Sequence, residues 1–133
     1  MSRKPEPMTN PITNRGTAFT RAERLEHGMI GRLPAAVETL EQQAQRCYRQ
    51  LQGLGCNIDR YVFLEELQNR NETLYYKLLV DHLVELLPVI YDPTVGEAIK
   101  KWSHAYRRSR AVYLSVDHIE DCLLYTSDAA DAL

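Results

Sequence analysis

Tyr91 is the residue whose type and neighbours point most directly to chemistry. Asp92 and Pro93 follow it and predict a helix start, with a side-chain acceptor at the N-cap and a residue of fixed φ at the first helical position. Gly96, in the first turn of that helix, has no side chain to block an approaching ligand. A phenol beside a helix N-terminus could bind a carboxylate and deliver a proton, because free N–H groups there favour an anion. The alternative, which the pattern alone favours, is a buried tyrosine next to a helix cap.

Apolar residues at helical spacing predict the element that leads to Tyr91. Asn71 opens the strongest helical pattern of the chain. Pro88 cannot continue this helix and pushes Leu87 toward extended geometry, so residues 89–90 are expected as a short buried segment that holds Tyr91. The expected inner face of the helix comprises Leu74, Leu78, Leu79, His82, Leu83, Leu86 and Leu87.

Three more helices are predicted nearer the N-terminus. Thr20 and Glu23 form a capping box that opens a short helix, which Gly28 can close. Asn57 or Asp59 can cap the last of the three. The middle helix has apolar residues at Val37, Leu40, Ala44, Cys47, Tyr48, Leu51 and Leu54, and the last has them at Ile58, Tyr61, Val62 and Leu67.

The stretch after Tyr91 predicts one more helix and then a strand. The helix ends in the basic cluster Arg107, Arg108 and Arg110, for which a structural role at the helix C-terminus, an anion site and a subunit contact all stay open. Residues 111–116 form the only convincing strand pattern. Four or five helices therefore precede any strand, and a single strand needs partners from elsewhere.

Two further patterns could hold a metal or a disulfide. His82 and Glu85 could place two metal ligands on one helix face, but a lone pair at this spacing is far more often solvated or at the edge of a core. The three cysteines are too few and too scattered for a disulfide scaffold or a zinc site. Cys47 lies on an apolar face and is most simply a small core residue.

Composition limits the class of protein. A chain of 133 residues with 44% hydrophobic and 26% charged residues is long enough for one domain with a modest core. A formal charge of −2 gives no basic surplus for nucleic acid. Because the chain has neither a run of eighteen apolar residues nor a signal-peptide pattern, no membrane partner and a cytoplasmic location are expected.

The run LPVIYDPTVGEAI, with RNETLYYKLLVDHLVELLP before it and SHAYRRSRAVYLS after it, resembles the N-terminal domain of malic enzymes. The resemblance begins at GTAFT and ends near Asp121. It implies a mostly α fold: the helical N-terminal domain of malic enzyme, followed by the first strand of a truncated α/β domain. It also implies oxidative decarboxylation of (S)-malate to pyruvate and CO2, with NAD or NADP and with Mg2+ or Mn2+, in a homodimer or homotetramer.

The resemblance implies roles for five residues. Tyr91 falls on the tyrosine of the family's Y-x-P-T-V-G box, which donates the last proton of the reaction. Arg46, Arg70, Glu38 and Asp81 match positions near a dicarboxylate activator site at the dimer interface in some members, although ordinary surface pairing is the simpler interpretation. Two departures are Asp92, where many members have Thr, and Ser109, where many have Pro.

The resemblance also predicts how the chain divides. Residues 1–15 are expected as a flexible leader, 16–121 as an incomplete malic enzyme N-terminal domain, and 122–133 as a non-native tail. The base, the metal ligands and the nucleotide-binding domain of the family have no counterpart here, so the chain alone is expected to be inactive. The alternatives are a non-catalytic helical dimerisation module, joined through the helices bearing Arg46 and Arg70, and a product that does not fold stably.

Overall fold

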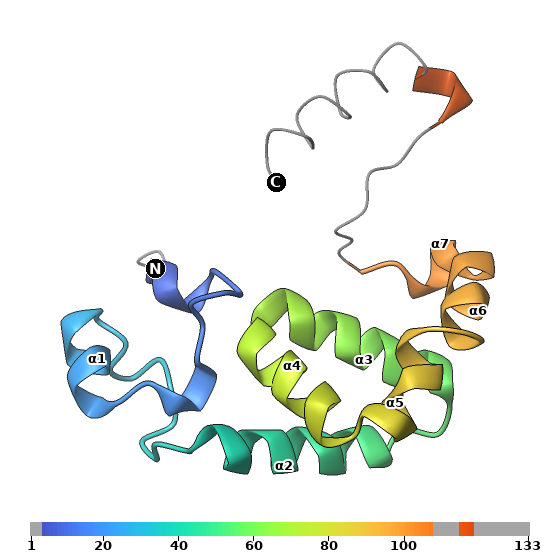
Figure 1. Cartoon of the computed structure of the whole chain (residues 1–133). Helices are drawn as coiled ribbons and strands as arrows, with labels where there is room; N and C mark the ends of the chain where they lie inside the picture. Colours follow the sequence, from blue (N-terminus) through green and yellow to red (C-terminus); the bar gives the residue numbers. More distant parts are fainter. Residues whose placement is uncertain (1–3, 108–114, 119–133) are drawn as a thin grey trace.

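The structure is a computed structural model that describes residues 4–107 and 115–118. Over these residues the chain is mostly helical and holds no β-strand, which confirms the mostly α prediction (Figure 1). The α-helices are α1 Arg21–Glu26, α2 Leu40–Gln52, α3 Asn57–Arg70, α4 Glu72–Asp81, α5 Leu83–Ile90, α6 Thr94–Lys100 and α7 Trp102–Ala105. The short 3-10 helices are η1 Glu6–Met8, η2 Gly16–Ala18 and η3 Val116–His118.

The hydrophobic core lies among α2, α3, α4 and α5. Helix α3 packs against α4, α5 and α6, while α4 also packs against α2 (Figure 1). Leu64, which is outside the predicted inner face of α3, is buried because this helix has neighbours on several sides. The core residues are Ala44, Cys47, Leu51, Leu64, Leu67, Leu74, Tyr75, Leu78, Leu79, Leu86 and Val89.

Capping residues set the starts of two helices. Thr20 and Glu23 form the predicted capping box of α1. Helix α2 begins at Leu40 rather than at the predicted Val37, because Thr39 and Gln42 form a second capping box that fixes the start. Helix α3 differs from the prediction in another way: Cys56 is its N-cap, and no side chain caps it.

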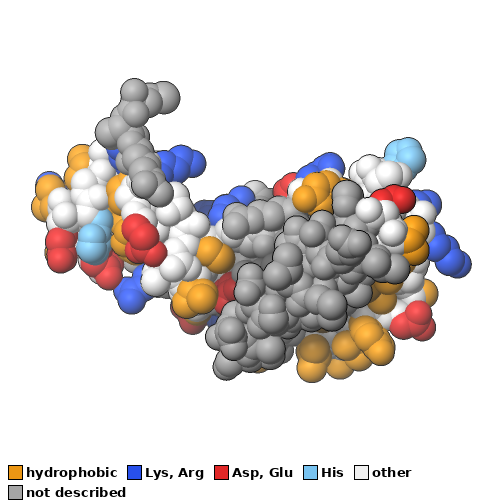
Figure 2. Space-filling view, turned by 90° about the horizontal axis from the view of Figure 1, so that it is seen from above, with side chains coloured by type: hydrophobic (Ala, Val, Ile, Leu, Met, Phe, Trp, Pro, Cys, Tyr) orange, Lys and Arg blue, Asp and Glu red, His pale blue; other side chains and the backbone are white. Residues whose placement is uncertain are grey.

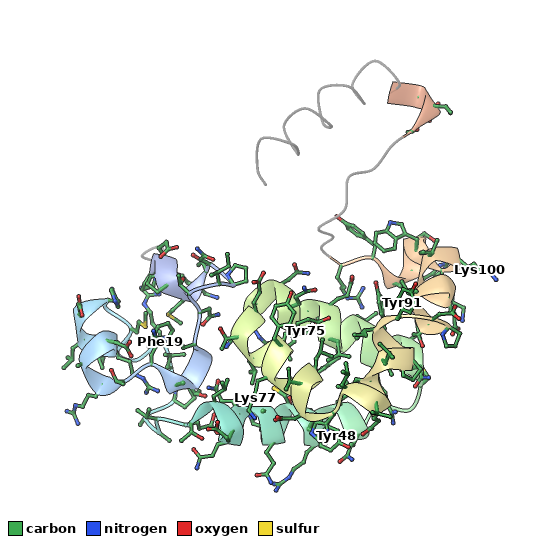
Figure 3. All side chains as sticks on the ribbon, in the orientation of Figure 1. Phe19, Tyr48, Tyr75, Lys77, Tyr91 and Lys100 are labelled. Atoms are coloured by element: carbon green, nitrogen blue, oxygen red, sulfur yellow. The ribbon has the colours of Figure 1, made fainter. Side chains whose placement is uncertain are left out.

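Arg24 organises the lobe formed by residues 15–37. Its guanidinium is buried and donates hydrogen bonds to the carbonyl oxygens of five residues, which are Thr17, Phe19, Pro34, Ala35 and Ala36. Gly28 follows α1 with a φ of 65°, so it closes the helix as predicted. One cation therefore holds the two ends of this lobe together, beside the buried Phe19 labelled in Figure 3.

The segment expected as a flexible leader makes defined contacts over residues 4–14. It carries η1, and its Asn14 side chain is buried and donates to the carbonyl of Arg70 at 2.8 Å. The amide of Glu72 donates to the carbonyl of Pro11 at 3.0 Å. These two bonds attach the segment to the junction of α3 and α4, which composition did not predict.

The helix predicted to run from Asn71 toward Leu87 is two helices. The backbone of His82 leaves the helical region, with φ −132° and ψ 31°, and separates α4 from α5. The prediction that Pro88 ends the helix was wrong, because α5 continues through Pro88 to Ile90. A proline removes one bond to the carbonyl four residues earlier, and here that carbonyl belongs to Val84, a solvent-exposed residue.

The strand predicted over residues 111–116 lies largely outside the described residues. Ser115 has no regular structure and Val116 begins η3, so no strand is observed there. Arg108, Arg110 and residues 122–133 also fall outside the described ranges. No helix within those ranges is long and apolar enough to cross a membrane.

Candidate functional site

Tyr91 lies at the junction of α5 and α6, where Figure 3 labels it. Its amide donates to the carbonyl of Leu87 at 2.9 Å, and its carbonyl accepts from the amide of Val95 at 2.8 Å. Its side chain is not buried, since the residue is 67% exposed. The alternative of a buried tyrosine was therefore wrong, and the backbone of Tyr91 is fixed on both sides while its phenol faces solvent.

Thr94 braces this junction from the first position of α6. It is 2% exposed, and its hydroxyl donates to the carbonyl of Pro88 at 2.7 Å. That carbonyl belongs to the last turn of α5, where carbonyls lack partners within the helix. The sequence placed Thr94 in the first turn but gave no sign of this bond, which ties the start of α6 to the end of α5.

The predicted cap of the helix after Tyr91 was wrong. Helix α6 starts at Thr94, Pro93 is its N-cap, and no side chain caps it. Asp92 therefore does not cap, and the amides of Val95 and Glu97 in the first turn already donate to the carbonyls of Tyr91 and Pro93. The anion site predicted at this helix start has no support in the geometry.

Gly96 lies in the first turn of α6 and faces open space. Apart from its two chain neighbours and the backbone of its own helix, no atom of the described residues lies within 4 Å of the position that a Cβ would take there. Packing within the chain therefore does not require a glycine at this position. This is the geometry expected where a ligand or another part of a protein approaches the backbone closely.

A second candidate site is a cavity of about 290 Å3 between the N-terminal lobe and the helices α2 to α4. Arg46 and Arg70, predicted to act together, both line it. The lining residues are Asn14, Gly16, Thr17, Leu33, Gln43, Arg46, Cys47, Gln50, Arg70, Asn71 and Leu74. Two guanidinium groups on one polar cavity suit a dicarboxylate, because each can donate two hydrogen bonds to a carboxylate group.

Glu38 joins this second site through Arg46. Its carboxylate accepts a hydrogen bond from the Thr17 hydroxyl at 2.5 Å and forms an ion pair with Arg46. The hydrogen bond from Thr17, followed by that from Arg46, lowers the pKa of Glu38. Asp81, the fourth predicted residue, does not line the cavity and pairs with Lys77 on its own helix at 2.7 Å.

His82 and Glu85 do not form a metal site with other ligands. Both contact Tyr48 of α2: the His82 ring stacks on the Tyr48 ring, and Glu85 accepts a hydrogen bond from the Tyr48 hydroxyl. Within residues 4–107 and 115–118, no group of three or more histidine, cysteine, aspartate and glutamate side chains could hold a metal ion. The described residues therefore do not fit the metal that the resemblance implies.

The basic cluster after α7 is described only at its first member. Arg107 forms an ion pair with Glu66 of α3, with 3.3 Å between the two side-chain atoms. This contact is the structural role that the sequence left open for Arg107. It connects the end of α7 to the middle of the bundle.

The region that contains Tyr91 and Thr94 matches a known domain. Residues 68–130 match the family model of the malic enzyme N-terminal domain. This part of the chain is similar to the N-terminal domain of malic enzymes. The matched residues include Tyr91, Thr94, whose hydroxyl bonds to the Pro88 carbonyl, and Gly96.

Curated malic enzymes and related oxidoreductases align with most of this chain. An NAD-dependent malic enzyme of Aeromonas hydrophila is 45% identical over 122 residues, which are 90% of this chain and 22% of that protein. An NAD-dependent malic enzyme of Sodalis glossinidius is 49% identical over 116 residues, or 85% of this chain and 20% of that protein. A Mycobacterium tuberculosis protein, whose name is that of an NAD malate oxidoreductase, is 50% identical over 119 residues. The chain spans about a fifth of the length of these relatives.

Proposed function

We propose that this chain supplies the proton-donor region of an NAD-dependent malic enzyme, which converts (S)-malate to pyruvate and CO2, and that Tyr91 is the general acid. The names of the relatives, NAD-dependent malic enzymes, support malate as substrate and NAD as cofactor. The observation that carries the proposal is the exposed phenol of Tyr91, held at a junction that Thr94 braces, with open space at Gly96 in the helix that follows.

The role of Tyr91 follows from the bonds that change. When bound, NAD accepts a hydride from C2 of malate, and the C2 hydroxyl loses its proton, which leaves a 2-keto acid. Loss of CO2 then breaks the C3–C4 bond. Its electron pair forms a C2–C3 double bond, and the pair of the C2 carbonyl moves to oxygen, which gives the enolate of pyruvate. The Tyr91 hydroxyl gives its proton to C3 and becomes a phenolate, while the enolate oxygen becomes the carbonyl of pyruvate again. No step is assigned to a metal, because the described residues do not fit one.

The test isolates the proton transfer from the hydride transfer. The aligned stretch of the Aeromonas hydrophila enzyme would be replaced by this chain, with and without Tyr91→Phe. Pyruvate would then be followed in deuterium oxide by proton NMR, because exchange of its methyl hydrogens requires the proton donor. Tyr91→Phe should slow this exchange by about 100-fold or more. Tyr76→Phe, at another exposed tyrosine, is the matched control and should leave the exchange unchanged.

Two results complete this test. Reduction of a 2-keto acid by NADH should survive Tyr91→Phe, because that step does not use the donor. Rapid methyl exchange in Tyr91→Phe would refute the proposal. The 133-residue chain alone, mixed with malate, NAD and Mn2+, should show no turnover above background, because a proton donor acts only on an enolate that other groups have produced.

A second proposal concerns the cavity of Arg46 and Arg70: we infer that it binds a dicarboxylate activator, with Glu38 orienting Arg46. The two arginines that line one polar cavity support this role, whereas Asp81 lies apart from it. Isothermal titration of the chain with fumarate should give binding that Arg46→Gln and Arg70→Gln each abolish. Arg49→Gln, on the same helix but outside the cavity lining, is the control. Equal loss in Arg49→Gln would contradict the assignment.

The alternative function is a dimerisation module without catalysis. Large apolar side chains exposed on α4 and α5 support it, since contiguous apolar surface marks interaction sites. Hydrophobic side chains also lie among charged ones on the face shown in Figure 2. The exposed large apolar residues of α4, α5 and the turn after them are Tyr76, Val80, Leu83, Val84, Leu87 and Tyr91. Light scattering on the purified chain would reveal a dimer, and a monomer at all concentrations would exclude this function.

A further inference from the structure

Tyr48 of α2 contacts two residues at the start of α5: His82, which is the N-cap, and Glu85, which lies in the first turn. Its hydroxyl donates a hydrogen bond of 2.6 Å to the Glu85 carboxylate. Its ring stacks flat on the His82 ring, with 3.6 Å between the ring centroids and 2° between the planes. The hydrogen bond to Glu85, reinforced by burial, raises the pKa of the Tyr48 hydroxyl, which keeps the phenol protonated as a donor. We call this three-residue contact the Tyr48 clasp.

The Tyr48 clasp acts at the break between α4 and α5, which is the last break between helices before Tyr91. His82 separates α4 from α5 with a non-helical backbone, and its side chain caps neither helix. Helix α5 is otherwise held by the burial of Leu86 and Val89 and by packing on α3, α4 and α6. Apolar burial is non-directional, so it does not by itself fix the orientation of α5. The short hydrogen bond from Tyr48 to Glu85 and the stack of Tyr48 on His82 each require a particular geometry.

Any movement at His82 is transmitted along helix α5 to Tyr91. Its eight residues span about 12 Å at about 1.5 Å per residue. A rotation of about 10° at the break would therefore move the far end by about 2 Å. A misplacement of about 1 Å can cost about 100-fold in rate when a reacting group must meet its target. Thr94 braces the far end of α5, and the Tyr48 clasp braces the near end.

We propose that Tyr48 is a positioning residue for Tyr91: through Glu85 and His82 it fixes the direction of α5, and with it the place of the Tyr91 phenol. This inference rests on the proposed function of Tyr91. Tyr48 itself does not touch the reacting atoms. In Figure 3, Tyr48 is labelled at the α2 side of the bundle and Tyr91 at the opposite end of α5.

The first test measures the backbone of the chain itself and needs no activity. Amide hydrogen exchange followed by NMR would compare wild type with Tyr48→Leu, which loses both contacts, and with Tyr48→Phe, which keeps the stack. In Tyr48→Leu the amides of Leu86, Leu87 and Tyr91 should exchange about 10-fold faster or more, because α5 opens locally. The amides of Leu64 and Leu78 should keep their protection. The exchange rates of these amides in Tyr48→Phe should lie between those of wild type and of Tyr48→Leu. In Glu85→Gln, which retains an acceptor, they should stay near the wild-type values.

The second test separates positioning from general stability. In the Aeromonas hydrophila chimera, Tyr48→Phe should lower the pyruvate methyl exchange by about 10-fold at saturating pyruvate, with the half-saturating concentration unchanged. Combined with Tyr91→Phe it should cause no further loss, because it acts only through Tyr91. If Tyr91→Phe has no effect while amide exchange changes as expected, the function of Tyr91 fails but the bracing of α5 stands. Uniform loss of protection across α2, α3 and α4 in Tyr48→Leu, or an unchanged rate in Tyr48→Phe, would overturn the proposal.

Discussion

At the scale of single residues, Thr94 shows how one hydroxyl joins two helices. Because it is buried and bonded to the Pro88 carbonyl, Thr94→Val should leave that carbonyl without its partner at nearly constant volume. The expected cost is about 1–2 kcal/mol of unfolding free energy. Thr94→Ser keeps the hydroxyl and should lose less. Urea unfolding followed by circular dichroism measures both, and equal stability of the Val and Ser variants would show that the bond contributes nothing.

Gly96 allows stability and activity to be separated. Gly96→Ala should stabilise the chain by about 0.5–1 kcal/mol, because alanine is the better helix former and no atom of the described chain lies close enough to clash. In the Aeromonas hydrophila chimera the same change should lower malate turnover, since the added methyl group occupies the open space through which a ligand would approach Gly96. Thermal unfolding and an NADH assay together test this. A variant that is more stable and equally active would mean that nothing approaches Gly96.

Tyr61 makes the stability of the chain sensitive to alkali. Burial, with the hydrogen bond that its hydroxyl donates to Glu65, raises its pKa to about 12. An unfolded tyrosine ionises near pH 10, so the contribution of Tyr61 is fully present below about pH 10 and is lost as pH rises through about 12. Tyr61→Phe should flatten the fall in unfolding free energy over this range. Urea midpoints measured from pH 9 to pH 11.5 would show it, and an unchanged slope would assign the alkaline loss to other groups.

At the scale of elements, the N-terminal lobe depends on a single cation. The buried Arg24 guanidinium donates to five carbonyls, and an ammonium group cannot reach all of them because it is a compact point charge. Arg24→Lys should therefore cost about 2–3 kcal/mol and speed proteolysis within residues 15–37. Arg21→Lys, at an exposed position of the same helix, is the matched control. Equal proteolysis of the two variants would show that the lobe is held by its apolar contacts alone.

The same elements show what sequence could and could not predict. The capping box of Thr20 and Glu23 was predictable because its two residues are three positions apart. The role of Tyr91 was inferred from the resemblance of its motif and stays a prediction. The break at His82 was missed, because the apolar spacing continues across it and only the backbone departs from the helix. The prediction that Asp92 caps α6 was wrong. The preference of aspartate for N-cap positions did not decide the start of this helix, which begins at Thr94 with Pro93 as its N-cap. The Tyr48 clasp joins residues 37 positions apart, which no local pattern encodes.

At the scale of the whole molecule, the surface of α4 and α5 differs from an ordinary solvated face. Val84 is 91% exposed and Val80 is 77% exposed, yet neighbouring charged groups such as Lys77 and Asp81 are already paired with each other. Burial of solvent-exposed apolar surface against a second surface is favourable by about 25 cal/mol per Å2. Self-association of the isolated chain through this face is therefore the outcome we expect.

Val84→Glu tests this face directly. An exposed glutamate removes apolar area and places like charges opposite each other in a symmetric contact, so it should shift a dimer to monomer by about 10-fold or more in dissociation constant. Ile12→Glu makes the same change at a 69% exposed residue outside α4 and α5, and should leave the assembly intact. Sedimentation velocity across a concentration series measures both. If Ile12→Glu dissociates the dimer and Val84→Glu does not, the contact lies on the N-terminal segment, and the α4–α5 face is free to meet the groups that complete the site of Tyr91.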